Sequence, residues 1–398
     1  MGRTLDKATL LERRFKRLKE EMRRKEIALA IFMKPENVFY YSGFNPILTH
    51  HKSFVVVPLE GEPTLLVHCI RGDHAKEEAW LRNIQYHGRW GDKTPLDPDP
   101  VKAIARLGEP VDLKNGALGL ELGYLPYQWV ERLRGAFHDP AVKDLSAYCE
   151  EALLVKDAHE IDMIRKASAL ADRAMEVMID SLRGGATEAE ASTAGQHAMR
   201  LLWQTAYPEY EISGFGGQEG GIIDGLNCWI LTGERIAFGC DCPKARKPEP
   251  GELVLPMVWA VLGGYYAENE RTVFAGSLDE FKMRAYNAML RAREAAFRQI
   301  RPGVPFERLY YAAVAVYEEA GFGRLLPGRI GHGIGLHAHE FPSIKPGNTI
   351  PLEPGMVFTV EPGIMTAAWG GVRHSDTVLV TEDGYELLTR SDNGTISI

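Results

Sequence analysis

The sequence predicts an α/β protein of two domains, and three observations lead to this prediction. The chain has 398 residues, which is long for a single domain. Up to about residue 155, short apolar runs alternate with turn-rich loops, as expected for the strands of an α/β domain. From Ala158 onward, long stretches with helical spacing take over, and two of them end in similar six-residue turns. We therefore expect domains at residues 1–157 and 158–398.

The first domain is expected to begin with an amphipathic helix over residues 8–25. Its apolar side chains recur at helical spacing: Leu11, Phe15, Leu18 and Met22. The basic residues between them are interpreted as a solvated face rather than a membrane or partner surface, because the apolar stripe needs a core. Strands are expected at residues 28–32, 54–57 and 64–67, and a loop at residues 92–100.

The second domain contains a faint internal repeat. Residues 182–187 (LRGGAT) and 300–305 (IRPGVP) each end one expected helix and open the next. The expected helices span residues 158–182, 187–203, 280–300 and 305–320, and Thr187 with Glu190 forms a capping-box pattern. Strands are expected at residues 252–262 and 357–364. Two copies of helix–turn–helix predict a domain built by duplication.

Composition narrows the function classes. The apolar content is 45% and the charged content 25%, as in ordinary globular proteins. A net charge of −8 and a pI near 5.9 argue against a nucleic-acid partner. No apolar run is long enough to span a membrane, and the N-terminus lacks the apolar core of a signal peptide. Five cysteines are too few for a disulfide framework, so we expect a cytoplasmic protein.

Three segments place carboxylates and imidazoles beside glycine. Residues 331–340 (GHGIGLHAHE) contain His332 and His339, and residues 359–363 (TVEPG) contain Glu361. Residues 264–272 (GYYAENERT) contain Glu268 and Glu270, which are two apart and would face the same side of a strand. Buried carboxylates need partners, and such groups bind metal or move protons. A structural ion pair, for example with Arg271, is the alternative.

The chain resembles the creatinase/prolidase family with the pita-bread fold, which also contains methionine aminopeptidases. The matching segments lie in the family's order over nearly the whole chain: residues 40–44 (YYSGF), the two hexads, 264–272, 331–335 with His339, 361–363, and 371–376 (GVRHSD). The resemblance implies an N-terminal creatinase/prolidase-type α/β domain that supports a homodimer. It also implies a C-terminal α+β pita-bread catalytic domain with a pseudo-twofold repeat.

The resemblance also implies a metal site, but this sequence departs from it. The family's metallopeptidases use two Asp, one His and two Glu, and these positions here read Met257, Glu268, His332, Glu361 and Ser375. Hard divalent ions need several carboxylate oxygens, so losing two of four carboxylates should abolish a two-metal centre. Glu268, His332 and Glu361 could still hold a single divalent ion, with Asp376 or His374 nearby. We expect that no cofactor is required, although one metal ion is possible.

The departures look like those of creatinase, the metal-free branch. Residues 264–272 fit its Gly-Tyr-Tyr…Glu-Arg-Thr pattern, and in that branch glutamates at the Glu270 and Glu361 positions hold the substrate's guanidinium group. The creatinase arginines that bind the creatine carboxylate fall at His51 and Ser343, so creatine is a doubtful substrate. Substrate-binding residues are expected to be Glu268, Arg271, His51, Lys52 and Tyr266.

Proton transfer is assigned to His332 and His339, because imidazole is poised near neutral pH. The general acid/base histidine of creatinase falls at Cys240 in this chain. Cys240 is either a nucleophile activated by a nearby histidine or an inert packing cysteine. The candidate catalytic residues are therefore His332, His339, Glu361, Glu270 and Cys240.

Three functions follow, in order of preference. The first is a creatinase-like hydrolase that cleaves a C–N bond of a small cationic or amidine-type substrate without metal. The second is a metallopeptidase of Xaa-Pro type with a reduced metal site. The third is a binding module on the same fold that has lost catalysis. The retained cluster of imidazoles and carboxylates argues against it, because a pure scaffold has no need for such a cluster.

Overall fold

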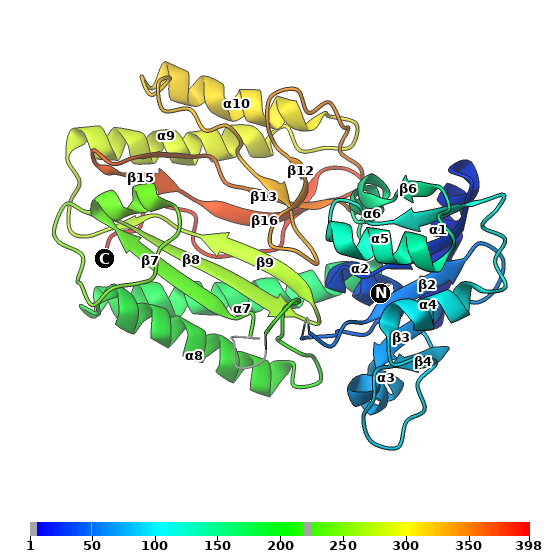
Figure 1. The fold of residues 1–398 in the computed structure, drawn as a ribbon. Helices are drawn as coiled ribbons and strands as arrows, with labels where there is room; N and C mark the ends of the chain where they lie inside the picture. Colours follow the sequence, from blue (N-terminus) through cyan, green and yellow to red (C-terminus); the bar gives the residue numbers. More distant parts are fainter. Residues whose placement is uncertain (1–5, 49, 219–223) are drawn as a thin grey trace. The chain divides into compact units, whose positions relative to one another are not determined.

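The computed structural model describes residues 6–48, 50–218 and 224–398, and the chain divides into two compact units (Figure 1). Unit 1 contains the described residues up to Ala152 and a segment beginning at Gly214. Unit 2 consists of Leu153–Ser213 and Asp224–Ile398. The extreme N-terminus, where we expect no signal peptide, lies outside the described residues. None of the helices in the described part of the chain has the length and hydropathy of a membrane-crossing segment.

Unit 1 is built on a six-stranded sheet with strand order β4-β3-β2-β1-β5-β6. Its strands are β1 (Ile27–Phe32), β2 (Phe54–Pro58), β3 (Thr64–His68), β4 (Ile84–His87), β5 (Ala117–Leu120) and β6 (Val142–Asp144). Its helices are α1 (Lys7–Arg24), α2 (Pro35–Ser42), α3 (Gly72–Glu78), α4 (Pro100–Gly108), α5 (Tyr127–Ala136) and α6 (Ser146–Ala152). The amphipathic N-terminal helix and the first three strands are confirmed within one or two residues.

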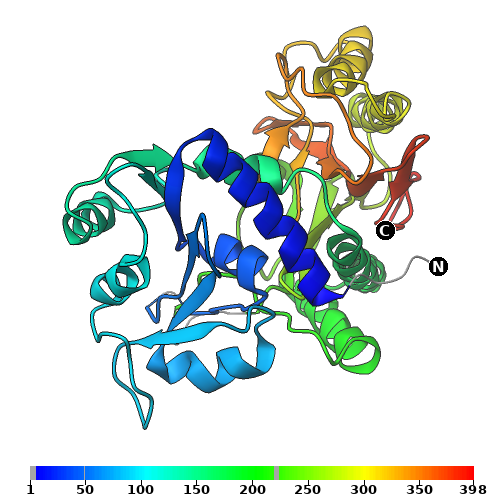
Figure 2. The same ribbon diagram turned by 90° about the vertical axis from the view of Figure 1, so that its right-hand side faces the viewer.

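Side-chain alternation along β1 explains the layers of unit 1. Leu29 and Ile31 pack into a core shared with α4 and α5. Phe32 faces the other way, with its ring centroid 4.6 Å from that of Tyr41 in α2. The apolar stripe of α1 is buried on this second side, and Figure 2 shows α1 in blue on the face opposite α4 and α5.

Unit 2 is built on a nine-stranded sheet, with β10-β8-β9-β16-β13-β11-β12 as its main path and β7 and β17 attached to β8 and β16. Its helices are α7 (Ala158–Arg183), α8 (Glu188–Ala206), α9 (Glu280–Phe297) and α10 (Phe306–Glu319). Its first strands are β7 (Asn227–Thr232), β8 (Leu253–Leu262), β9 (Tyr265–Glu270) and β10 (Val273–Phe274). The later strands are β11 (His332–Gly333), β12 (Glu340–Ser343), β13 (Val357–Val360), β14 (Gly363–Thr366), β15 (Gly370–Arg373), β16 (Ser375–Val380) and β17 (Tyr385–Leu387).

The two helix pairs of unit 2 cover different faces of this sheet. Val254 and Val258 of β8 pack with α7 and α8, whereas Leu253 and Leu255 pack with α9 and α10. Figure 1 shows α7 and α8 on one side of the strands and α9 and α10 on the other. Because both faces of β8 are covered, this strand is an almost continuous apolar run.

The internal repeat has a structural basis in the two hexads. Gly185 and Gly303 occupy the same place in their hexads and both have a left-handed backbone, with φ of +81° and +84°. Thr187 and Glu190 form the expected capping box at the start of α8. The strand expected over residues 357–364 is interrupted, because Pro362 has no N–H to donate to a ladder. β13 therefore ends at Val360, and β14 pairs with β15 in a separate sheet.

Candidate active site

The strand β9 divides its side chains between two environments. Glu268 and Glu270 face one side and Asn269 and Arg271 the other, as strand alternation requires. The register places Trp259 of β8 opposite Glu268 and Met257 opposite Glu270. On the other edge, Ser375 of β16 also lies opposite Glu270. Directly opposed residues project from the same face, so these five side chains form one layer.

A second set of strands adds an imidazole and a third carboxylate. The backbone N–H of His332 donates to Thr359 Oγ1 at 3.1 Å, and the backbone N–H of Glu361 donates to the Ile330 carbonyl. A Cβ at Gly331 would lie 2.0 Å from the Thr359 carbonyl oxygen, so only glycine permits this close approach. Nε2 of His332 lies 3.2 Å from Glu361 Oε1 and 3.7 Å from Glu268 Oε2.

Glu268 is held by two neutral donors. The hydroxyl of Ser375 donates to Glu268 Oε1 at 2.6 Å, and the indole N–H of Trp259 donates to Oε2 at 2.8 Å. Both donors come from the strands that flank β9. The carboxyl group of Glu268 therefore has a fixed orientation in which both oxygens accept hydrogen bonds.

Arg373, at the end of β15, fills the space between the other two carboxylates. Its Nη2 donates to Glu270 Oε1 at 2.6 Å, and its Nε makes an ion pair with Glu270 Oε2. Nη1 lies 3.8 Å from Glu361 Oε2, and Nη2 lies 3.6 Å from the Met257 sulfur. The Glu270 carboxylate is thus already paired with a cation of the protein itself, the guanidinium of Arg373.

The burial of these groups changes their proton affinity. Burial alone would lower the pKa of His332, but the hydrogen bond to Glu361 and the charges of Glu268 and Glu361 raise it. Burial would raise the pKa of Glu361, but His332 and Arg373 outweigh it and bring the pKa to about 2. Burial and the charge of Glu361 raise the pKa of Glu268. His332 and Glu361 therefore form a charged pair next to a more basic carboxylate.

The remaining carboxylate and the second imidazole are shifted as well. Burial raises the pKa of Glu270 to about 8, while the guanidinium of Arg373 opposes this rise. The rings of His332 and His339 lie 4.1 Å apart between centroids. Loss of water around its ring, reinforced by the charge of His332, lowers the pKa of His339 to about 4. His339 is therefore a neutral imidazole beside a charged one.

These groups open into a cavity of about 760 Å³ within unit 2. Glu268, Glu270, Glu361, Arg373 and His339 line it, and the exposed thiol of Cys240 lies at its wall. Of the residues that the sequence suggested as catalytic, Glu270, Glu361, His339 and Cys240 line this cavity, whereas His332 is buried beside Glu268 and Glu361. Whether Cys240 reacts stays a prediction, because its wall position fits either interpretation.

Three of the predicted companions have partners elsewhere: Arg271, Asp376 and His374. Arg271 is fully buried on the far face of β9, where Nη2 donates to Asp376 Oδ1 at 2.6 Å, so its prediction as a substrate-binding residue is wrong. Asp376 is also held by Nε of Arg293 at 2.5 Å, and Nδ1 of His374 accepts from the Thr272 N–H at 3.1 Å. Asp376 is therefore unavailable as an extra metal ligand, and His374 belongs to none of the groups of described residues that could hold a metal ion.

The other substrate-binding predictions stand differently. Glu268 lines the cavity, whereas Tyr266, on the same face of β9, is not among the described residues that line it. His51 and Lys52 belong to the loop before β2 in unit 1, and their role stays a prediction. Sequence reasoning missed Arg373, and it interpreted Trp259 as a core residue, with a place in the wall of a pocket as the alternative. Arg373 lies in residues 371–376, which carried the resemblance, and Trp259 faces Glu268 once β8 and β9 are paired in register.

Comparisons with known proteins give this arrangement a family. Residues 162–382, more than half of the chain, match the model of metallopeptidase family M24. The chain belongs to metallopeptidase family M24. Residues 14–152 match the creatinase/prolidase N-terminal domain. The predicted family and the predicted two-domain α/β fold with a pita-bread second domain are thereby confirmed, and this M24 protein is a hydrolase.

Full-length relatives support this placement. The M24 chain is 29% identical over 384 residues to a Xaa-Pro dipeptidase of Pyrococcus furiosus, covering 96% of this chain and 99% of that one. An uncharacterized peptidase of Staphylococcus epidermidis is 29% identical over 378 residues, with 95% and 99% covered. The prolidase structure from Pyrococcus horikoshii OT3 superposes with a TM-score of 0.80 at 26% identity, covering 96% of this chain and 99% of that one.

The M24 fold implies divalent metal. Among the described residues of this cluster, two sets have ligand atoms within 4.8 Å of one another: Glu268, His332 and His339, and Glu268, Glu270 and Glu361. Their oxygens already accept from Ser375, Trp259, His332 and Arg373. The family's other two positions hold a buried thioether, Met257, and a hydroxyl, Ser375. This donor set does not fit a two-metal centre, which needs bridging carboxylates free of internal cations.

Proposed function

We propose that this M24 protein hydrolyses an amide C–N bond in a dipeptide-sized substrate, at the Glu268–His332–Glu361 cluster and without a two-metal centre. The observation that carries the proposal is the guanidinium of Arg373, which binds Glu270 and lies 3.8 Å from Glu361, one of the positions that bind metal in the family. A positive charge of the protein itself is thus present beside that position.

The geometry supports a proton-transfer route that uses only side chains of this chain. Water attacks the carbonyl carbon and forms the new C–O bond, while Glu268 takes the water's proton. His332, held charged by Glu361 at 3.2 Å, gives its Nε2 proton to the nitrogen as the C–N bond breaks. The proton on Glu268 then returns to His332 across 3.7 Å, and the site is reset with acid and amine as products.

The names of the relatives support a peptide-like substrate, since a Xaa-Pro dipeptidase is among those that match over nearly the full length. Cleavage at Xaa-Pro is therefore the first substrate class to test. A second candidate is the predicted cationic or amidine-type substrate. It is favoured by the retained Glu270 and Glu361 pair, but such a cation would have to displace Arg373 from Glu270.

The experiment is a hydrolysis panel with protein purified in the presence of a strong chelator. Xaa-Pro dipeptides, other dipeptides and small guanidino or amidine compounds are offered, and release of amine is measured. We expect turnover of at least one amide substrate, lost by about 100-fold or more in His332→Gln. Failure of every dipeptide, or equal activity in His332→Gln, would remove the proposal. Turnover of guanidino compounds alone would favour the second candidate.

We also propose that the protein is a homodimer and that it is cytoplasmic. The predicted homodimer fits the match of residues 14–152 to the creatinase/prolidase N-terminal domain. Cytoplasmic location fits the five free cysteines.

A further inference from the structure

We infer that Arg373 is the resident cation of this site: it balances the carboxylate cluster in place of metal ions and keeps divalent ions out. This inference deepens the proposed function and concerns the same cluster. Its test measures ion binding, so it can fail or succeed separately from turnover.

The carboxylate oxygens of the cluster already have partners within the protein. Both oxygens of Glu268 accept from neutral donors of the flanking strands, and both oxygens of Glu270 face the guanidinium of Arg373. Glu361 Oε1 faces His332, and its Oε2 lies 3.8 Å from Arg373 Nη1. Every oxygen of the cluster thus has a donor or a cation. A metal ion could coordinate only by displacing protein partners, which is costly at buried sites.

Met257 lies next to the pair formed by Arg373 and Glu270. The register places Met257 directly opposite Glu270, and the Met257 sulfur lies 3.6 Å from Arg373 Nη2. A carboxylate at position 257 would compete with Glu270 for the guanidinium. The neutral thioether leaves Glu270 as the partner, and a planar guanidinium suits two parallel bonds to one carboxylate. Met257 therefore leaves the guanidinium of Arg373 to Glu270.

The positive charge of Arg373 also lies at the wall of the cavity. Arg373 lines the cavity beside Glu361, so its charge is fixed near the groups that move protons. A preorganised cation in a water-poor site stabilises negative charge that develops on a carbonyl oxygen. Arg373 thereby supplies the electrostatic part of metal-ion catalysis with no ion to lose.

The test is calorimetric titration of chelated, dialysed protein with MnCl2 and, separately, ZnCl2. We expect wild type to bind neither ion at micromolar concentrations. Arg373→Met should bind Mn2+ at least tenfold more tightly than wild type, because three buried carboxylates lose their internal cation. Arg373→Lys should stay close to wild type. Lys345→Met, which removes another cavity-lining cation, is the matched control and should not gain affinity.

A second variant guards against misfolding of Arg373→Met. Arg373→Met/Glu270→Gln removes the pair together, leaves no unpaired charge at position 270, and should also bind Mn2+ more tightly than wild type. Raised melting temperature in the presence of Mn2+, seen for these variants and absent in wild type, gives an independent readout. Stoichiometric, micromolar binding of either ion to wild type would overturn the inference, and so would the absence of any gain in both variants.

Discussion

At the scale of single residues, two arginines with neighbouring partners have opposite roles. Arg373 faces the cavity and binds Glu270, whereas Arg271 lies behind the same strand and binds Asp376. Its Nη1 also donates to the Ser375 and Glu270 carbonyls, both at 2.8 Å. Arg271 therefore connects β9 to β16 by hydrogen bonds, and this fixes the position of Glu268 relative to Ser375.

Replacing Arg271 should cost much more stability than replacing an exposed arginine. Arg271→Ala leaves Asp376 short of a partner in a fully buried site, so we expect the free energy of unfolding to fall by about 3–5 kcal/mol. Arg291 pairs with Glu319 at 3.3 Å on the surface, and Arg291→Ala should cost about 0.5 kcal/mol or less. Chemical denaturation of both variants gives the comparison, and similar losses would contradict it.

His87 in unit 1 should make stability depend on pH. Burial lowers its pKa to about 4, and its Nε2–H donates to the Lys52 carbonyl at 2.8 Å. In the unfolded chain histidine titrates near 6.5, so below that pH the unfolded state binds the proton more tightly. The stabilisation is complete above about 6.5 and is lost as the pH falls toward 4, by about 3 kcal/mol in total.

The matched variant for this prediction is His87→Gln, which keeps a donor for Lys52 but does not titrate. Both proteins are denatured at pH values from 7.5 to 4. As the pH falls, the free energy of unfolding of wild type should decrease relative to that of His87→Gln. An advantage that is constant with pH would show that His87 is not the group responsible.

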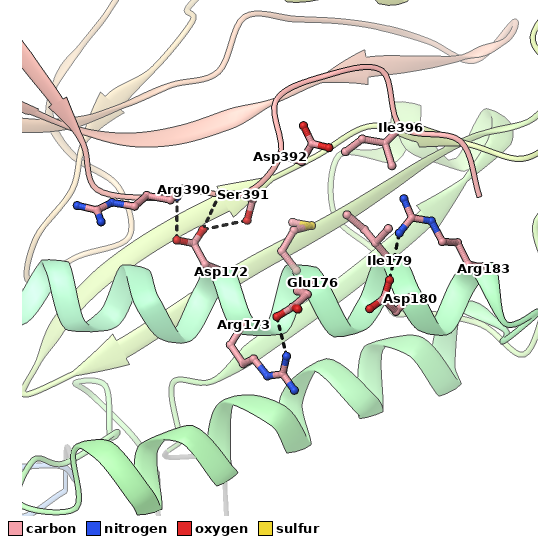
Figure 3. Close-up of a pocket in the computed structure, with 11 residues that line it drawn as sticks. Asp172, Arg173, Glu176, Ile179, Asp180, Arg183, Arg390, Ser391, Asp392 and Ile396 are labelled. Atoms are coloured by element: carbon pink, nitrogen blue, oxygen red, sulfur yellow. Dashed lines mark hydrogen bonds and ion pairs between the residues drawn. The ribbon is translucent and has the colours of Figure 1, made fainter.

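At the scale of secondary-structure elements, β9 is supported from behind by the chain's C-terminal segment. Asn269 Nδ2 donates to Asp172 Oδ1 at 2.8 Å and to Ser391 Oγ at 2.7 Å. Asp172, on α7, also accepts from the backbone N–H groups of Arg390 and Ser391 at 2.7 and 3.2 Å. Figure 3 shows Asp172 reaching up to this segment, beside a cavity of about 350 Å³ between α7 and Ile396. α7 thus positions the C-terminal segment, and this segment in turn supports β9, the strand that carries Glu268.

Asp172→Ala should release this segment, while a nearby change on the same helix should not. Without the Asp172 carboxylate, several N–H donors lose their acceptor. We therefore expect the free energy of unfolding to fall by about 2 kcal/mol and amide hydrogen exchange at Arg390 and Ser391 to become faster. Asp180 pairs with Arg183 at 3.1 Å on the exposed side of the same helix, and Asp180→Ala should change stability by about 0.5 kcal/mol or less. Unchanged exchange in Asp172→Ala would refute the support of β9 by this segment.

At the scale of the whole molecule, the sequence predicted the longer helices and some of the strands, but not helices α2–α6 or most of the shorter strands. The four helices of unit 2 and the strands β8 and β13 follow from apolar spacing, and the hexads marked the duplication correctly. Local signals suffice there because each element has one dominant buried face. The exception is the strand over residues 357–364, where Pro362 ends the ladder and turns Glu361 toward His332.

The site was only partly predictable. The residues that gather around the cavity follow from motif order, but their pairings depend on register between strands far apart in sequence. The creatinase-like pattern of residues 264–272 suggested Arg271 as a substrate ligand, although strand alternation places it on the face opposite Glu270. By the same alternation, the side chains of Ser375 and Asp376 project from opposite faces of β16. Arg373 was overlooked because its partner is chosen by the pairing of β8, β9 and β16, which no local pattern contains.

The most direct test of a catalytic site without a two-metal centre is to measure turnover and metal content on one sample. Chelated, dialysed protein is divided into fractions, loaded with graded Mn2+, Co2+ or Zn2+, and assayed for amide hydrolysis alongside elemental analysis. The account predicts a rate that is already full at less than about 0.1 ion per chain and does not rise with loading. A rate that is absent in chelated protein and grows in proportion to bound metal would contradict it.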